Sequence, residues 1–330
     1  MNDSNGLKRR TVTGLAAAAA AAPLARPFAA RAAGPRKIGF VYVGPRDLAA
    51  PRVEVILAGV RAAGVQDEIE MVLRVTEGDP ARLAPAIAEV LAQDIAVYVS
   101  IGPAVLQAVR KATDRVPIVA TNFESDPVAE GFVQSVARPG GNITGVFLDV
   151  PAFVGKWLEF LRECLPGLSR VALLWDVGSG RVQADALTRT ARDQGIATEL
   201  LEIRAPADYD GAFARAAASG VGAAILLSSP LVFANIPGLA ALSLQHRLPT
   251  ITMFAEFARA GGLLSYGPSA LGAMKQAGFL AGRILRGKAP ATLPVEQPSI
   301  YNLAINLRSA AQLGVTMPPT LVARADDLVE

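Results

Sequence analysis

Hydrophobic and polar positions form a regular alternation of short apolar runs and longer amphipathic stretches. The apolar runs predict strands at 37–43, 70–75, 95–99, 117–120 and 143–147. Apolar residues three and four positions apart predict helices between them, at 51–63, 80–93 and 103–113. Strands that are nearly continuous in apolar residues and alternate with amphipathic helices are typical of a parallel sheet covered on both faces.

The same pattern starts again after residue 147. Strands are predicted at 171–175, 198–203, 224–227, 250–254 and 263–266. Helices are predicted at 151–164, 181–194, 207–219, 235–246 and 270–286. The tail after residue 290 is rich in proline and predicts one strand (301–306) and one short helix (308–313). Two β/α runs of similar length predict an α/β protein with two doubly wound parallel-sheet lobes.

The first 32 residues follow a different pattern, which predicts an export signal. A basic segment ending in Arg9-Arg10 precedes an alanine-rich apolar run (14–25), and Ala30-Arg31-Ala32 offers a cleavage site. The arginine pair and the alanine-based core resemble a twin-arginine signal; a general secretory signal with two arginines is the alternative. The apolar run is too short to span a bilayer. We therefore expect cleavage near Ala32 and a soluble, exported mature chain without an integral membrane segment.

The export signal also explains the basic isoelectric point of about 9.2. The whole chain has a net charge of +3, from 32 basic and 29 acidic residues. Without residues 1–32, it has 27 basic and 28 acidic residues and a net charge of −1. A nearly neutral chain produces no field that attracts a polyanion, so no nucleic-acid partner is expected.

Residues able to carry catalysis are few. One cysteine (Cys164) and one histidine (His246) exclude an intramolecular disulfide and a His/Cys zinc cluster. The best candidate for a dinucleotide-binding turn, Gly178-Ser179-Gly180, has Gln183 where the third glycine belongs, and it also lacks the spacing of a hydrolase nucleophile. Cys164 is predicted to be a small buried hydrophobe, and Asp326-Asp327 a solvated acidic pair. We predict no enzyme activity, no cofactor and no metal.

Polar and aromatic residues follow several strands of the first run, where ligands bind in open parallel sheets. These candidates are Tyr42, Ser100, Gly102, Pro103, Asn122 and Phe123. Pro103 is a favoured first helical residue. Ser100 is interpreted in two ways: it holds a ligand carboxylate together with backbone N–H groups, or it caps the helix.

The second run offers a similar set of residues after its strands. These are Trp175, Asp176, Ser228, Ser229 and Phe254. Ser228-Ser229-Pro230 repeats the combination of serine and proline near Ser100. The two aromatic residues are interpreted as walls for an organic ligand or as caps on the core. Asp176 or Glu256 is a candidate partner for a ligand ammonium, or a solvated acid.

Several long motifs occur in order along the chain, at 111–119, 126–145, 156–159, 170–175, 261–268, 293–298, 305–307 and 323–326. With them the chain resembles the ABC-transporter substrate-binding proteins of the tryptophan/tyrosine-binding type, which have the class I periplasmic-binding-protein fold. The resemblance covers nearly the whole mature chain. Segments 43–46 and 121–125 depart from the family locally and lie on the pocket side, which puts an aromatic amino acid ligand in question.

The resemblance implies two lobes, joined by three hinge crossings, that close around a ligand. It places the crossings near 145–150, 264–268 and 298–304, with Gly145 and Gly267 as hinge or turn glycines. Lobe 1 is then 33–147 and 268–300, and lobe 2 is 148–267 and 301–330. Asp126 and Tyr266 join the candidate ligand-binding residues.

We therefore expect a periplasmic solute-binding component of an ABC importer, which delivers an amino-acid-like or aromatic carboxylate ligand to permease and ATPase subunits. The alternative is a ligand-sensing protein that feeds a signalling receptor.

Overall fold

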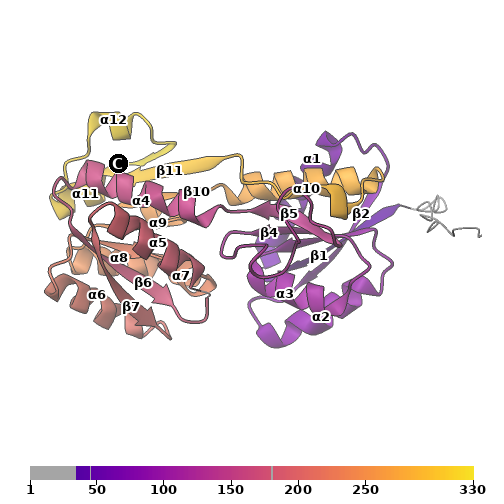
Figure 1. The fold of residues 1–330 in the computed structure, drawn as a ribbon, viewed down its shortest axis with the longest axis horizontal. Helices are drawn as coiled ribbons and strands as arrows, with labels where there is room; N and C mark the ends of the chain where they lie inside the picture. The colour runs from indigo at the N-terminus through magenta and orange to yellow at the C-terminus, as the bar shows by residue number, and fades with distance from the viewer. Residues whose placement is uncertain (1–34, 45, 180) are drawn as a thin grey trace, which may run out of the picture. The chain divides into compact units, whose positions relative to one another are not determined.

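The computed structural model describes residues 35–330 apart from 45 and 180, so the predicted export signal over 1–32 lies outside the described residues. Two β-sheets organise the described chain, with strand orders β2-β1-β3-β4-β5 and β12-β11-β10-β9-β8-β6-β7 (Figure 1). We call the part built on the first sheet lobe 1 and the part built on the second sheet lobe 2. Helices cover both faces of each sheet, which confirms the predicted doubly wound α/β fold.

Lobe 1 is built on five parallel strands: β1 (Arg36–Tyr42), β2 (Ile69–Val75), β3 (Val97–Ile101), β4 (Ile118–Asn122) and β5 (Ile143–Phe147). On one face lie α1 (Ala49–Ala62) and α10 (Ala270–Leu285), and on the other α2 (Leu83–Leu91) and α3 (Pro103–Ala112) (Figure 1). Short 3₁₀ turns are η1 (Arg46–Leu48), η2 (Pro80–Arg82) and η3 (Pro290–Thr292). Alternate strand residues enter opposite cores, since side chains point to opposite faces along a strand.

Helix α10 belongs to lobe 1 although it follows lobe 2 in the sequence. It packs against α1 so closely that glycines are required on both helices. A Cβ on Gly59 would lie 2.0 Å from the Lys275 carbonyl oxygen, and one on Gly278 would lie 2.1 Å from the Ile56 carbonyl oxygen. This packing fixes the return of the chain to the first sheet.

Lobe 2 contains five parallel strands: β6 (Arg170–Asp176), β7 (Ala197–Ile203), β8 (Ala223–Leu226), β9 (Thr250–Thr252) and β10 (Leu264–Pro268). One face is covered by α4 (Val150–Cys164) and α5 (Val182–Asp193), and the other by α6 (Asp208–Ala218), α8 (Ile236–Gln245) and α9 (Ala255–Arg259). Helix α7 (Pro230–Ala234) follows β8 directly. Among the described residues, no helix combines the length and apolar character needed to cross a membrane.

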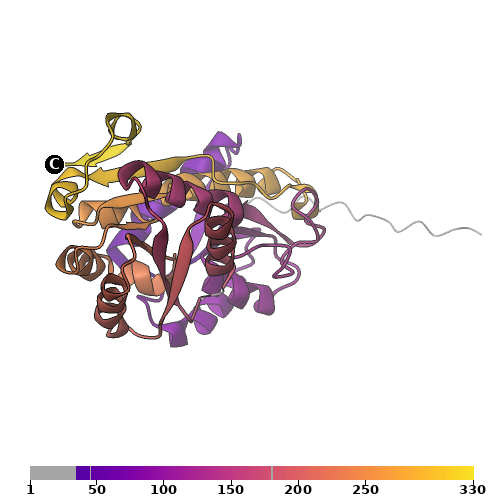
Figure 2. The ribbon, with the colours of Figure 1, turned by 60° about the vertical axis from the view of Figure 1, so that its left-hand side comes forward.

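The tail makes the second sheet mixed rather than purely parallel. Strand β11 (Tyr301–Asn306) runs antiparallel to β10, and β12 (Asp327–Val329) pairs in parallel with β11 at the sheet edge (Figure 2). Helices α11 (Leu307–Leu313) and α12 (Pro319–Val322) lie between these two strands in the sequence. The tail thus adds one antiparallel pairing to a sheet whose other neighbouring strands are parallel.

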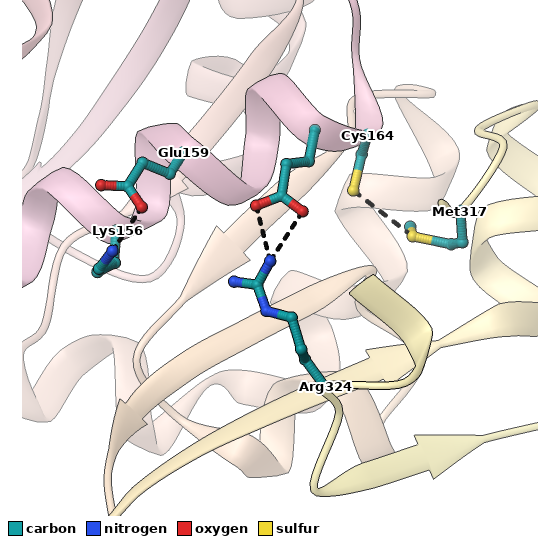
Figure 3. Close-up of polar contacts among 6 residues, drawn as sticks. Lys156, Glu159, Cys164, Met317 and Arg324 are labelled. Atoms are coloured by element: carbon teal, nitrogen blue, oxygen red, sulfur yellow. Dashed lines mark hydrogen bonds and ion pairs between the residues drawn. The ribbon is translucent and has the colours of Figure 1, made fainter. Parts of the chain in front are cut away.

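Side chains tie this tail to α4 (Figure 3). The Arg324 Nη1 atom lies 3.0 Å from each carboxylate oxygen of Glu163, and the guanidinium also lies over the Phe160 ring. The Cys164 Sγ lies 3.5 Å from the Met317 Sδ, and Cys164 is buried as predicted. The tail is thus part of lobe 2 rather than a loose extension.

Asp326 is exposed, as predicted for a solvated end, and Asp327 is half-buried, but both acids also bond to the rest of lobe 2. The Leu303 backbone N–H donates to Asp326 Oδ2 at 2.8 Å, and the Asp326 N–H donates to the Leu303 carbonyl at 2.8 Å. The Asp327 carboxylate pairs with Arg259 at 2.6 Å. Both acids therefore hold β12 against the sheet.

The chain passes between the two sheets three times: after β5, after β10 and before β11. The predicted hinge glycines lie inside strands next to two of these passages. A Cβ on Gly145 would lie 2.0 Å from the Ala120 carbonyl oxygen, and one on Gly267 would lie 2.1 Å from the Met253 carbonyl oxygen. Close approach of the neighbouring strand therefore requires a glycine at both positions, and their hinge role stays a prediction.

Candidate functional site

The loop after β4 is held in shape by Asn122, whose side chain is almost fully buried. Its Oδ1 accepts a hydrogen bond from the Glu124 backbone N–H at 2.9 Å, and its Nδ2 donates to the Ser125 hydroxyl at 2.7 Å. An Asn side chain that bonds the backbone two residues later forms a turn without help from a sheet or helix. Asn122, a predicted ligand contact, thus fixes the direction of Glu124.

Glu124 joins this loop to the loop after β8. Its Oε2 accepts a hydrogen bond from the Phe123 N–H at 3.2 Å, and its Oε1 accepts one from the Ser228 hydroxyl at 3.2 Å. Burial is the largest influence on the carboxyl group and raises its pKa above 4.5, against the lowering effect of these hydrogen bonds. Part of the residue's surface nevertheless remains exposed.

Gln183, at the start of α5, holds the other side of this contact. The Ser228 backbone N–H donates to Gln183 Oε1 at 2.9 Å, and Gln183 Nε2 donates to the Ser228 carbonyl at 3.4 Å. Both residues are buried. The Ser228 hydroxyl is therefore presented to Glu124 from a backbone that is fixed by a side chain of another element.

Phe123 packs against the hydrophobic cores of both lobes. The backbone carbonyl of the neighbouring residue Asn122 accepts a hydrogen bond from the Leu148 N–H at 3.3 Å. The loop after β4 thus contacts lobe 2 through an aromatic ring and the Glu124 carboxyl.

The turn after β3 contradicts the interpretation of Ser100 as a helix cap, while its interpretation as a ligand contact stays a prediction. The residue that caps α3 is Gly102, with φ of +82° and no side-chain hydrogen bond, and Pro103 begins the helix. The Gly102 N–H donates to the Thr121 carbonyl at 2.8 Å. Ser100 is fully buried, and its hydroxyl has no hydrogen-bond partner among the described residues. Ser100 does not cap the helix, because the cap position falls two residues later.

Aromatic side chains gather at the strand ends of lobe 2. The Trp175 ring is almost buried, donates from Nε1 to the Ser179 carbonyl at 2.9 Å, and lies under the Arg181 guanidinium. Phe254 makes an edge-to-face contact with Phe233 at 5.2 Å between ring centroids, and 48% of the Phe233 surface is exposed. Phe233 is therefore the most open aromatic surface in this group, although the sequence interpretation passed over it.

Four further predicted residues have partners within their own lobe. The Asp176 carboxylate accepts from the Gly178 N–H at 2.9 Å, and the Asp126 carboxylate accepts from the N–H groups of residues 128 and 129 at 2.8 and 3.0 Å. The Ser229 hydroxyl caps α7 by accepting from the Val232 N–H at 3.0 Å. Tyr42 packs in the core of lobe 1, where burial raises its pKa.

Tyr266 lies in an aromatic cluster of lobe 2. Its ring stacks on Phe153 and Tyr301, each with centroids 5.7 Å apart, and meets the edge of Phe160 at 4.9 Å. Its backbone carbonyl accepts from the Trp157 indole N–H at 2.8 Å. These contacts give Tyr266 a packing role; a ligand contact there stays a prediction.

Two hollows occur elsewhere on lobe 2. One, of about 670 Å³, lies between the end of α4 and the tail, and the other, of about 630 Å³, lies beside β7 and α6. No predicted ligand-binding residue lines either of them. Within the described residues, no group of three or more His, Cys, Asp or Glu side chains is placed to hold a metal ion.

Comparison with known protein families decides the class of protein. A family model described as ABC transporter substrate binding protein matches residues 47–329. The chain belongs to this family. The predicted resemblance is therefore confirmed, and the family consists of substrate-binding proteins rather than enzymes.

This substrate-binding protein is also similar to individual proteins and to solved structures. A tyrosine-binding protein from Clostridioides difficile is 25% identical over 207 residues, which are 61% of this chain and 57% of that protein. The match thus spans less than two thirds of that relative. A conserved domain protein from Vibrio cholerae has a TM-score of 0.78 at 24% identity, covering 89% of this chain and 100% of that chain. An ABC domain from Streptococcus pneumoniae in complex with L-Trp has a TM-score of 0.76 at 20% identity, covering 90% and 100%. These two structures share the fold.

The structure adds Glu124, Gln183 and Phe233 to the residues predicted for this substrate-binding protein. Glu124 had a signal in the sequence, because it follows a predicted strand inside a segment that departs from the family. Gln183 was noticed only as a missing glycine. Phe233 lies in a helix of five residues, too short to show a helical period.

Proposed function

We propose that this protein is the periplasmic solute-binding component of an ABC importer and binds a small, amino-acid-like or aromatic carboxylate ligand between its two lobes. The observation that carries the proposal is the meeting of two strand-end loops, one from each sheet, at the Glu124–Ser228 hydrogen bond of 3.2 Å. Ligands of open parallel sheets bind at these carboxyl ends. Family membership supports the same location.

The ligand class is supported by the relatives and by the aromatic residues near this contact. One relative is named a tyrosine-binding protein, and one solved neighbour is a complex with L-Trp. In this chain, Phe123 lies beside Glu124, and Phe233 offers an open ring at the strand ends of lobe 2. Aromatic rings provide large apolar contact areas for an organic ligand.

Export to the periplasm and transfer to permease and ATPase subunits complete the proposal. The support is the basic and alanine-rich segment over residues 1–32 together with family membership. Replacing Arg9 and Arg10 by lysine should abolish export if the signal is of the twin-arginine type. Unchanged periplasmic accumulation, measured by fractionation and immunoblotting, would contradict that part of the proposal.

Ligand binding is tested by thermal shift of the purified protein against amino acids, aromatic acids and small metabolites. A ligand at 100 times its Kd should stabilise the folded state by about 2.7 kcal/mol. Phe233→Ala should weaken the shift produced by an aromatic ligand, whereas Phe279→Ala should leave it unchanged. Phe279 is a suitable control because it is 38% exposed and lies on α10. If no compound shifts the melting temperature, the binding function is refuted.

A further inference from the structure

Glu124 is a desolvated carboxyl group without a counter-charge. The groups that bond it are the N–H of Phe123 and the hydroxyl of Ser228. The influences on its pKa are burial, these two hydrogen bonds and one from its own backbone N–H; no charged group of the described chain is among them. A buried carboxylate without a cation is costly, so the group requires either a proton or a cationic partner.

The other acids near the strand ends do not share this property. The carboxylates of Asp126 and Asp176 each accept backbone N–H bonds in turns of their own loops. Glu256 is exposed at the start of α9, where water solvates its charge. Of the acids considered at these loops, Glu124 therefore gains most from an external cation.

The surroundings of Glu124 are fixed before a ligand arrives. Asn122 holds the Glu124 backbone at 2.9 Å, and Gln183 holds the Ser228 backbone on the opposite loop at 2.9 Å. A recognition group whose supporting atoms are already in place loses little entropy when it binds. Glu124 also keeps part of its surface exposed.

We propose that the Glu124 carboxylate binds the cationic amino group of the ligand and so selects amine-bearing ligands over amine-free acids of the same shape. This inference rests on the proposed function and makes it more specific. It assigns the ammonium contact to Glu124 rather than to Asp176 or Glu256.

At pH values below the raised pKa of Glu124, the empty site holds a proton that the ligand displaces. Since the pKa of Glu124 is raised above 4.5 in the folded protein, the folded state binds more protons than the unfolded chain just above that pH. The free energy of unfolding of the empty protein should therefore fall as the pH rises from about 4.5 through the raised pKa. Across the same window, the affinity for an amine should rise, because less proton must be displaced.

The test uses isothermal titration calorimetry with two matched sets of probes. One set is L-tyrosine, tyramine and 4-hydroxyphenylpropionate; the other is L-tryptophan, tryptamine and indole-3-propionate. We expect the wild-type protein to bind amine-bearing members more tightly than the amine-free acids. Glu124→Gln should weaken binding of the amines roughly 10- to 100-fold, as expected for loss of a charged hydrogen bond, and should leave the amine-free acids almost unchanged. Glu256→Gln is the control and should change neither.

Two measurements of proton binding distinguish recognition of the ligand amine by Glu124 from a purely structural role of this residue. Titrations over a pH series rising from 4.5, in buffers of different ionisation enthalpy, should show proton release on amine binding by the wild type and none by Glu124→Gln. Thermal melts of the empty proteins should show stability that falls with pH above 4.5 in the wild type and is nearly flat in the variant.

The possible results separate the assignment of Glu124 from the proposed binding function. Equal affinity of Glu124→Gln and wild type for the amines, or binding of an amine-free acid by the wild type as tightly as its matching amine, overturns the assignment of Glu124 but leaves the binding function standing. Loss of amine binding in Glu256→Gln instead of Glu124→Gln overturns it as well. If neither these probes nor the thermal-shift compounds bind, the proposed function fails and this inference fails with it.

Discussion

Two turns of this protein combine serine and proline at the start of a helix, yet they are built differently. In the turn after β8, the Ser229 hydroxyl accepts from the Val232 N–H, and Pro230 begins α7. In the turn after β3, Pro103 begins α3, but the cap is Gly102 and no side chain bonds the helix. The first turn closes through a side chain, and the second through the backbone.

The difference comes from spacing. Ser229 directly precedes its proline, so its hydroxyl falls at the cap position. Ser100 lies three residues before its proline, and the cap position falls on Gly102, whose φ of +82° and ψ of 162° suit glycine alone. Ser100 is left with a buried hydroxyl without a partner in the described chain. Similar composition thus gives a satisfied turn in lobe 2 and an unsatisfied one in lobe 1.

The largest expected effect is at the backbone-built turn. Gly102→Ala should lower the free energy of unfolding by about 2–3 kcal/mol, because an L side chain is strained at this φ and ψ. Nothing lies within 4 Å of the added Cβ, so steric overlap does not contribute. Gly238→Ala, in an exposed helical position of α8, is the control and should stabilise by about 0.5 kcal/mol. Chemical denaturation measures both, and an unchanged Gly102→Ala would contradict the comparison.

The second largest loss of stability is expected when Gln183, which holds the turn after β8, is replaced. Gln183→Leu should cost about 2 kcal/mol, because it leaves the buried Ser228 N–H without a partner. Gln194→Leu, near the end of the same helix and only partly buried, should change stability by less than about 0.5 kcal/mol. Equal effects of the two substitutions in urea titrations would show that Gln183 does not hold the turn.

A smaller effect is expected at the cap itself. Ser229→Ala should cost about 1 kcal/mol, since the Val232 N–H loses its acceptor, while Ser229→Gly should cost only a few tenths of a kcal/mol. Thermal melts of the three proteins measure the difference. If alanine and glycine are equivalent to serine, the side chain does not close the turn.

The smallest effect sharpens the comparison most. Ser100→Ala should change stability by less than about 0.5 kcal/mol, because removing an unpaired hydroxyl leaves no group unsatisfied. A loss above about 1 kcal/mol would reveal a partner for Ser100 in the empty protein. Weaker ligand binding at unchanged stability would instead identify the hydroxyl as a ligand contact.

The sequence predicted the long elements well, because each contains enough residues to show its period. The strands and helices of both β/α runs were predicted to within a few residues of their observed ends. The α-helices and strands it missed, α7, α9, α12 and β12, have three to five residues each. Elements of this length show no period and owe their existence to tertiary contacts.

The candidate site was predicted less completely than the fold. Strand ends pointed to the loops that meet at Glu124 and Ser228, but sequence does not give the direction of a side chain within a loop. Asp126 and Glu124 are two residues apart, and only coordinates show that the first accepts backbone hydrogen bonds in its own turn while the second reaches Ser228. Gln183 contacts Ser228 across 45 positions of sequence, which no local pattern predicts.

The three residues of β12 also bear on how the protein behaves in a crowded compartment. Without β12, the last three residues of β11 would present unpaired N–H and C=O groups, which are a template for pairing with another molecule. The very short strand β12 covers this edge and leaves little length for a strand of another molecule to pair with. Asp327 holds β12 in place through Arg259, and Asp326 does so through Leu303. By holding β12 in place, the acidic pair Asp326-Asp327 disfavours pairing of this sheet edge with strands of other molecules.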